Sequence, residues 1–291
     1  MTQPKIAILP ISVLADAKAY MMALEQKYTL NAFQRRIIHE RYVYSVDGDD
    51  AKSLVIAAWP LQPALYEFCY KGRSVQTLLD DNYAEAGDEE AQLVQAFADR
   101  GHSLRAVNWL PLKHLAVRGG LCEYGRNNLA YCGEWGSFTW LGGYVSDMPP
   151  PEDYIWQKLD VTNMRACASC DECVNTCKMG AITHVQWLLD AEKCMTYHNY
   201  YDNLPDWIPS EAHRHLHGCY ACQRVCPANS RRVQGLLPTV FDEAQTQIML
   251  DAATFADYPQ EIKDKLAQFD PARDFAFMPR NLRLMLENVP K

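Results

Sequence analysis

The stretch CASCDECVNTCKMG, residues 167–180, is the most informative part of the sequence. Its four cysteines, Cys167, Cys170, Cys173 and Cys177, have the spacing C-x2-C-x2-C-x3-C. Gaps of two residues let consecutive thiolates curl around one cubane of iron and sulfur, and the fourth cysteine of such a run ligates a neighbouring cluster. The stretch therefore predicts a bacterial-ferredoxin-like fold that holds two clusters.

Four more cysteines further along the chain complete the set. Cys194 stands alone, Cys219 and Cys222 are separated by two residues, and Cys226 is followed by Pro227. In two-cluster ferredoxins the fourth cysteine of each run binds the other cluster, which we call the crossover rule. By this rule Cys226 binds with the first three cysteines of the run, and Cys177 binds with the other three. The predicted ligands are Cys167, Cys170, Cys173 and Cys226 for one [4Fe-4S] cluster, the first cluster, and Cys177, Cys194, Cys219 and Cys222 for the other, the second cluster.

Zinc is the alternative metal, because C-x2-C pairs also bind zinc. Zinc knuckles use pairs separated by longer loops, however, and not three closely spaced cysteines followed by a fourth. The spacing favours iron and sulfur. The other cysteines, Cys69, Cys122 and Cys132, have no partner at metal-ligand spacing and are expected to be buried core residues.

The composition is that of a globular protein. The chain has 291 residues, 48% of them hydrophobic, and no run of eighteen or more apolar residues. Its N-terminus, MTQPKIAILPISVL, lacks a basic region and a small-residue cleavage site, so we expect a cytoplasmic protein without disulfides or a membrane partner. The formal net charge of −8 does not suggest a nucleic-acid partner.

Helical and strand-like patterns alternate over the first half of the chain, which predicts an α/β or α+β domain there. The patterns predict helices over Val13–Tyr28, Asp88–Arg100 and Leu110–Arg118, and strands over Ser53–Trp59, Ser103–Val107, Asn128–Cys132 and Ser137–Val145. Beyond Pro227 only helices are expected, over Asp242–Leu250, Pro259–Phe269 and Pro279–Asn288.

The segment DMPPP, residues 147–151, can continue neither a helix nor a central strand and is the expected domain boundary. The predicted architecture is α+β: an N-terminal α/β domain over residues 1–150, a double-cluster ferredoxin-like domain over residues 151–232, and a helical C-terminal extension over residues 233–291.

Two segments carry a resemblance to the epoxyqueuosine reductase family. One is CASCDECVNTCKMGAITHVQWLLDAEKCMTYHNYY with the later HGCYACQRVCPAN, which resembles the family's double-cluster domain and includes an isolated cysteine after L-D-A-x-x-C. The other is LKHLAVRGGLCEYGRNNLAY with GSFTWLGGYVSDMPPP, which resembles its cobalamin-binding domain. The resemblance implies a fold related to the reductive dehalogenases.

The resemblance implies that the protein binds a corrinoid next to two [4Fe-4S] clusters. Electrons would pass from an external low-potential donor, such as a ferredoxin or flavodoxin, through both clusters to cobalt. The corrinoid contacts that it implies are Gly72, Arg73, Tyr124, Gly125, Gly136, Ser137 and Phe138.

The sequence departs from the family on the substrate side. Where the family has the sequence G-R-D-Y-H, this chain has Gly72-Arg73-Ser74-Val75-Gln76. An ungapped alignment that runs back from Gly120-Leu121 places the family's proton-donating acid at Ala106. The helical repeats with which the family holds tRNA are also expected to be missing, since the chain ends soon after its last predicted helix. We therefore expect neither tRNA as a partner nor epoxyqueuosine as the substrate.

Three functions are consistent with these observations. The first is a corrinoid-dependent reductase of a small molecule, and the second is an electron-transfer protein that reductively activates a cofactor on a partner, such as a corrinoid protein. The third is a scaffold in which the clusters are structural. The reductase is favoured over the electron carrier because residues 1–150 form a larger domain than electron transfer requires.

Overall fold

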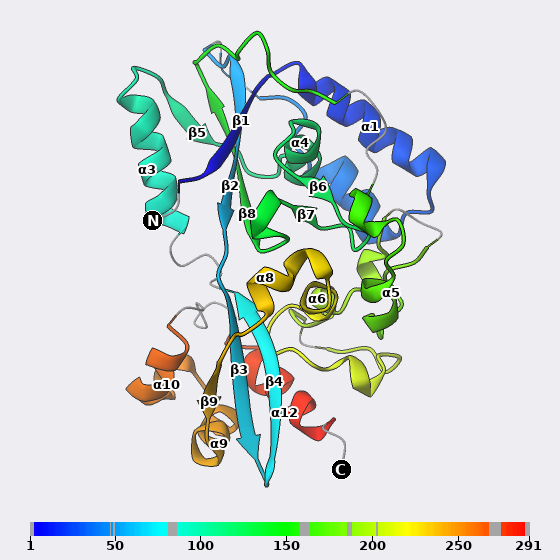
Figure 1. Cartoon of the computed structure of the whole chain (residues 1–291), viewed down its shortest axis with the longest axis vertical. Coiled ribbons are helices and arrows are strands. Elements are labelled where there is room, and N and C mark those ends of the chain that lie inside the picture. Colours follow the sequence, from blue (N-terminus) through cyan, green and yellow to red (C-terminus); the bar gives the residue numbers. More distant parts are fainter. Residues whose placement is uncertain are drawn as a thin grey trace. The chain divides into compact units, whose positions relative to one another are not determined.

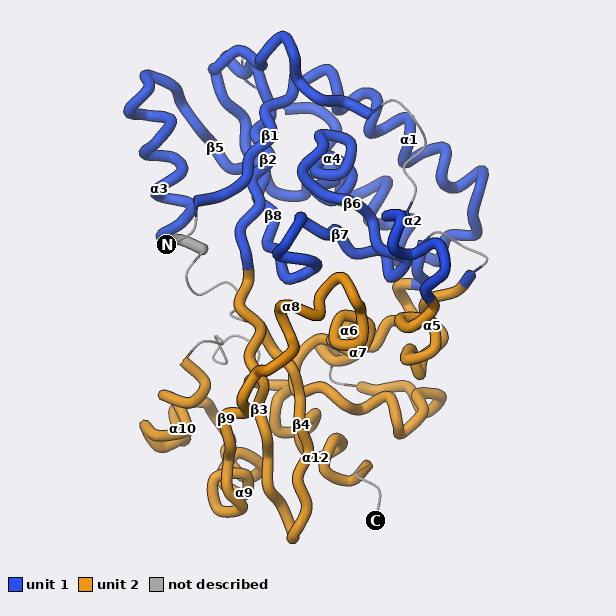
Figure 2. Tube along the Cα trace, in the orientation of Figure 1, with its two compact units in different colours: residues 1–60, 86–170, 184–190 blue, residues 61–85, 171–183, 191–291 orange. Residues whose placement is uncertain are grey.

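The computed structural model (Figure 1) describes residues 3–46, 48, 50–80, 86–157, 163–184, 188–201, 203–267 and 275–288. The chain forms two compact units, coloured separately in Figure 2. Unit 1 comprises residues 1–60, 86–170 and 184–190, and unit 2 comprises residues 61–85, 171–183 and 191–291.

Unit 1 is built on a four-stranded sheet with the strand order β1-β2-β8-β5. Its strands are β1 (Lys5–Pro10), β2 (Ser53–Pro60), β8 (Thr139–Ser146) and β5 (Leu104–Ala106). All three neighbouring pairs are antiparallel. Of the two fold classes expected for this region, the antiparallel sheet makes it α+β, because the α/β class requires parallel strands.

The central strand β2 explains why the sequence SLVIAAW has no polar alternation. Leu54, Ile56 and Ala58 face one core cluster, and Val55, Ala57 and Trp59 face another. A strand covered on both faces is expected to be apolar throughout. The two clusters therefore lie on opposite faces of the sheet.

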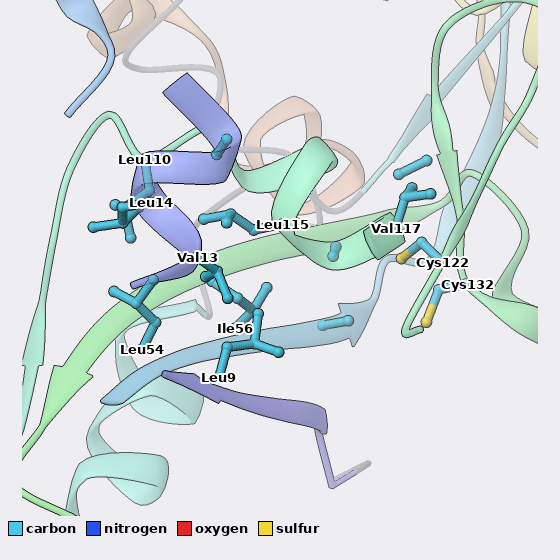
Figure 3. Close-up of a cluster of buried hydrophobic side chains, with 14 of the residues drawn as sticks. Leu9, Val13, Leu14, Leu54, Ile56, Leu110, Leu115, Val117, Cys122 and Cys132 are labelled. Carbon is cyan, nitrogen blue, oxygen red and sulfur yellow. The ribbon is translucent and has the colours of Figure 1, made fainter. Parts of the chain in front are cut away.

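Helices of unit 1 cover both faces. Helix α1 (Val13–Lys27) and helix α4 (Leu112–Arg118) pack on the first core cluster, which Figure 3 shows with Cys122 and Cys132 at one end. Helix α3 (Ala86–Ala98) packs on the other face. The short α2 (Ala32–Arg36) begins at a capping box formed by Asn31 and Gln34, and a π-helical turn, Ile37–Arg41, follows it.

A small hairpin follows α4. Its strands are β6 (Glu123–Tyr124) and β7 (Ala130–Tyr131), and Tyr124 pairs with Ala130. The hairpin leads into a 3-10 turn, Gly133–Trp135, before β8. Two of the expected corrinoid contacts, Tyr124 and Gly125, therefore lie in this hairpin.

Unit 2 contains a three-stranded sheet with the order β4-β3-β9. Strands β3 (Pro63–Tyr70) and β4 (Arg73–Asp80) form an antiparallel hairpin, and β9 (Pro238–Phe241) pairs with β3 in parallel. Lys71 and Gly72 have φ angles of 50° and 71°, so they form the tight turn between β3 and β4. Two consecutive positive φ angles are typical of the type I′ turn, which matches strand twist.

The helices of unit 2 are short. Helix α9 (Glu243–Asp251) packs on β3 and β9, α12 (Met278–Glu287) packs on α9 and β4, and α10 (Gln260–Lys265) lies between them in sequence. The cysteine region contributes α5 (Glu172–Thr176), α6 (Met195–His198), α7 (Ala221–Arg224) and α8 (Ser230–Val233). Helices this short are not stable by themselves, so other contacts must hold this region.

The predicted elements of the first half are confirmed within a few residues. One prediction for the second half is wrong: residues 233–291 are not wholly helical, because β9 lies among them. Four residues are too few for a periodic pattern, and β9 exists only through its pairing with β3. Strands β1, β3, β4 and β6 were also not predicted. The last two residues of the helix expected over Pro259–Phe269 lie outside the described residues.

The two units do not follow the predicted domain boundaries. The hairpin formed by β3 and β4 comes from the first 150 residues but belongs to unit 2. Units defined by contacts need not coincide with functional domains, so the predicted domains stay a prediction. In the described part of the chain, no helix is both long enough and apolar enough to span a bilayer.

Candidate iron–sulfur site

The four cysteines predicted for the second cluster all lie in unit 2. Burial, and then the neighbouring Cys194 and Cys177, together raise the pKa of Cys219 to about 12. Cys177 and Cys219 also pack against one apolar cluster that contains Met179 and Met195. The structure thus brings three of these thiols together across more than forty residues of sequence.

Backbone amides are directed at two of these sulfur atoms. Burial raises the pKa of Cys194, and hydrogen bonds from Thr196 and from the Tyr197 amide oppose the shift. Cys194 immediately precedes α6, so amides of the first helical turn lie beside its sulfur. The Ala221 amide at the start of α7 similarly reaches Cys219. Such N–H···S contacts are characteristic of iron–sulfur ligands.

The C-P-x-N ending of the motif has a structural role that sequence reasoning missed. Asn229 is completely buried, and its side-chain amide donates to the Gln223 carbonyl of α7 over 2.9 Å. Its backbone N–H donates to the Cys226 carbonyl, also over 2.9 Å. Asn229 therefore ties the turn after Cys226 back to the helix that carries Cys222. The asparagine three residues after the last predicted ligand is the sequence signal that could have identified it.

The cysteines predicted for the first cluster are divided between the units. Cys167 and Cys170 end the main part of unit 1, whereas Cys173 on α5 and Cys226 belong to unit 2. The grouping of these four thiols rests on the crossover rule and stays a prediction. Within unit 2, α5 and α7 pack together, which places Cys173 beside the helix that bears Cys222.

Cys167 is held by the tip of the hairpin formed by β6 and β7. The Arg126 amide donates to the Cys167 sulfur over 3.4 Å, and the Arg126 guanidinium donates to the Cys167 carbonyl over 2.6 Å. The Met164 amide donates to the Tyr124 carbonyl over 2.7 Å. Cys167 is only 7% exposed.

The donor set suits [4Fe-4S] clusters. It is made entirely of thiols that are buried or half-buried, and amides face several of the sulfurs. Among the described residues, no three His, Cys, Asp or Glu side chains are placed to hold a single ion. The thiolates around a cubane each bind a different iron, so they are spaced more widely than the ligands of one ion. Because burial raises the pKa of Cys194 and Cys219, iron binding must displace their protons.

Comparison with known families identifies this region. Residues 166–229 match the model of the 4Fe-4S double cluster binding domain, and this stretch contains all eight predicted ligands. The protein therefore carries two [4Fe-4S] clusters.

Comparison with curated proteins and solved structures extends beyond this domain. The chain is 28% identical over 165 residues to the epoxyqueuosine reductase of Shewanella oneidensis, covering 54% of this chain and 39% of that protein. It is 29% identical over 148 residues to the Synechocystis epoxyqueuosine reductase, covering 50% and 48%. The epoxyqueuosine reductase structure from Bacillus subtilis superimposes with a TM-score of 0.64 and 20% identity over 97% of this chain and 77% of that one. The chain is a relative of the epoxyqueuosine reductases.

The similarity covers only part of each of these two enzymes. The matches to the Shewanella and Synechocystis enzymes span 39% and 48% of those proteins, so the chain spans about half their length or less. Reductive dehalogenases superimpose with a TM-score of only 0.37, which is too low to show a shared fold. The dehalogenase-like part of the predicted fold stays a prediction.

The predicted corrinoid contacts of this epoxyqueuosine reductase relative fall into two groups. Gly72 and Arg73 lie at the turn between β3 and β4 in unit 2. The other five, Tyr124, Gly125, Gly136, Ser137 and Phe138, lie in unit 1. The turn geometry by itself accounts for Gly72, because its φ of 71° favours a residue without a side chain.

Three of the five residues in unit 1 have packing roles in the structure. Tyr124 and Phe138 are buried with 3% and 0% exposure, so their side chains form no open wall for a ligand. A Cβ atom on Gly125 would lie 2.4 Å from the Tyr131 ring, which explains why glycine occupies the hairpin tip. Their geometry therefore does not reveal a corrinoid site. Corrinoid contact by these residues stays a prediction, and no chemical step is derived through cobalt.

Proposed function

We propose that this protein is an iron–sulfur reductase that passes low-potential electrons through its two [4Fe-4S] clusters to a small-molecule substrate. The double-cluster domain, in a chain with the fold of epoxyqueuosine reductases, supports the proposal. An external ferredoxin or flavodoxin would supply the electrons. A corrinoid would supply a strongly reducing cobalt centre when bound. This protein's own contribution is the buried thiol framework and the amides that face its sulfurs.

The cluster ligands are part of the proposal. We assign Cys167, Cys170, Cys173 and Cys226 to the first cluster and Cys177, Cys194, Cys219 and Cys222 to the second. Anaerobically prepared protein should contain about eight irons per chain. Cys170→Ser should disturb one cluster and Cys194→Ser the other, each visible as a separate loss in the electron paramagnetic resonance (EPR) spectrum. Two zinc ions and no iron would overturn the assignment.

The substrate proposal excludes epoxyqueuosine in tRNA. One epoxyqueuosine reductase structure was solved with an epoxyqueuosine-modified tRNA stem loop, and the structure from Bacillus subtilis is described as having its aspartate catalytic loop swung out of the active site. In this chain Ala106 is the last residue of strand β5, and the loop that follows it runs to Pro111. No Asp or Glu occurs between Leu104 and Pro111. Neither strand β5 nor the loop after it therefore offers a carboxylic acid to protonate a leaving oxygen.

Two assays test these proposals. Cobalamin added to the anaerobic protein should change the corrinoid spectrum and bind at micromolar concentration, about −8 kcal/mol. Absence of binding would favour the electron carrier that acts on a partner. The second assay supplies reduced donor, cobalamin and epoxyqueuosine-containing tRNA, and we expect no queuosine by mass spectrometry. Turnover comparable with that of an epoxyqueuosine reductase would overturn the substrate proposal.

A further inference from the structure

We propose that Arg126 raises the reduction potential of the first cluster by donating hydrogen bonds to both the sulfur and the carbonyl of Cys167. The inference rests on the proposed role of Cys167 as an iron ligand. Arg126 then controls how readily this cluster accepts an electron.

Both contacts come from one residue and reach one cysteine. The Arg126 amide donates to the Cys167 sulfur over 3.4 Å, and the Arg126 guanidinium donates to the Cys167 carbonyl over 2.6 Å. The second distance is short because the donor is charged. Together the contacts fix the orientation of the ligand and place a positive charge beside it.

Contacts within the hairpin formed by β6 and β7 fix the backbone at Arg126. Gly125 lies so close to the Tyr131 ring that any side chain would collide with it. The side chain of Asn127 donates to the Tyr131 hydroxyl over 3.0 Å, and Lys113 donates to the Asn128 carbonyl over 2.9 Å. Asn128 has a φ of 61°, which turns the chain back towards β7. The backbone at Arg126 is therefore fixed by its neighbours on both sides.

The sign of the effect follows from charge. Reduction takes a [4Fe-4S] cluster with four thiolates from about −2 to about −3. A positive charge and an N–H dipole at a ligand stabilise the more negative state, so both raise the potential.

Side-chain variants separate the two contacts. Every residue except proline retains the amide N–H, so replacement of Arg126 removes only the guanidinium. Arg126→Gln removes the positive charge, and Arg126→Lys retains it without the planar fork. Arg35→Gln is the matched control, because the Arg35 guanidinium donates to the Leu30 carbonyl over 2.6 Å elsewhere in unit 1.

The experiment is an anaerobic redox titration of the full chain, followed by EPR spectroscopy and iron analysis. In Arg126→Gln we expect the midpoint potential of one cluster to fall while that of the other is unchanged. Arg126→Lys should show a smaller fall, and Arg35→Gln none. Cys167→Ser identifies which signal belongs to the first cluster.

The outcomes separate this inference from the proposed function. Full iron content with unchanged potentials in Arg126→Gln would overturn the inference and leave the reductase proposal intact. Loss of the first cluster from both Arg126 variants would also overturn it, because Arg126 would then be needed for assembly and not for tuning. If Cys167→Ser left both clusters intact, Cys167 would not be a ligand and the proposed ligand assignment would fail.

Discussion

The single residue Gly125 links the packing of unit 1 to the proposed iron site. Gly125→Ala places a methyl group against the Tyr131 ring, and overpacking of this kind costs about 1–3 kcal/mol. Because the next residue donates its amide to Cys167, we expect the variant to lose iron as well as stability. Iron per chain and chemical denaturation measure the two effects.

Gly72→Ala is the matched control for this variant. Gly72 has a φ of 71°, and no atom lies within 4 Å of the place that an alanine methyl group would take, so the substitution brings strain of about 1–2 kcal/mol but no collision. Its iron content should remain normal. Equal iron loss in both variants would show that general destabilisation, and not the hairpin tip, controls iron binding.

His114 on α4 gives unit 1 a predictable response to acid. It is 1% exposed and stacks on Tyr20 with a centroid distance of 4.4 Å, and neither ring nitrogen has a hydrogen-bond partner among the described residues. Burial, and then the nearby Arg118 charge, lowers the pKa of His114 to about 3. The unfolded chain takes up a proton at this histidine below about pH 6.5, and the folded chain does so only near pH 3. Stability should therefore fall as the pH drops through this window.

His114→Phe tests this pH dependence. The variant keeps an aromatic ring against Tyr20 and removes two buried nitrogens that lack partners in the described structure. Its melting temperature at pH 7.5 should equal or exceed that of the natural protein, and it should decrease less between pH 7.5 and 5.5. Some dependence should remain, because burial also lowers the pKa of His215 to about 3. An unchanged slope would contradict this role for His114.

At the scale of elements, β9 shows how a four-residue strand is held by its packing. Phe241 at its end is completely buried and stacks on Phe68 of β3, with ring centroids 4.9 Å apart. Phe241→Ala should destabilise unit 2 by about 3–5 kcal/mol. Leu237→Ala, at a residue that is 88% exposed just before the strand, should change stability by less than about 0.5 kcal/mol. Chemical denaturation of both variants checks the difference, and similar effects would show that β9 is not part of the core.

At the scale of the whole molecule, iron and the protein fold are expected to be coupled. Helices α5, α6 and α7 have five, four and four residues, too few to be stable without tertiary support. Removal of iron should therefore unfold residues 166–229 locally while the sheet of unit 1 persists. Hydrogen exchange measured by mass spectrometry should show increased exchange in this stretch and little change in β1, β2 and β8. Uniform protection in the iron-free protein would contradict the coupling.

Features that depend on local spacing could be predicted from the amino-acid sequence. The cysteine run from Cys167 to Cys177 predicts its metal chemistry because its spacing is set within a few residues of the chain. Helix α1 and strand β2 were predicted because their apolar residues recur with the period of the element that they form.

Tertiary structure decided what depends on distant parts of the chain. It pairs β9 with β3 across about 170 residues, places the β3–β4 hairpin in unit 2, and sets Arg126 against Cys167, 41 residues away. It also fills the interior with Tyr124 and Phe138, which the family resemblance implies as ligand contacts. Periodic patterns report which residues share a face, whereas these contacts depend on the path by which the chain returns, and no local pattern encodes that path.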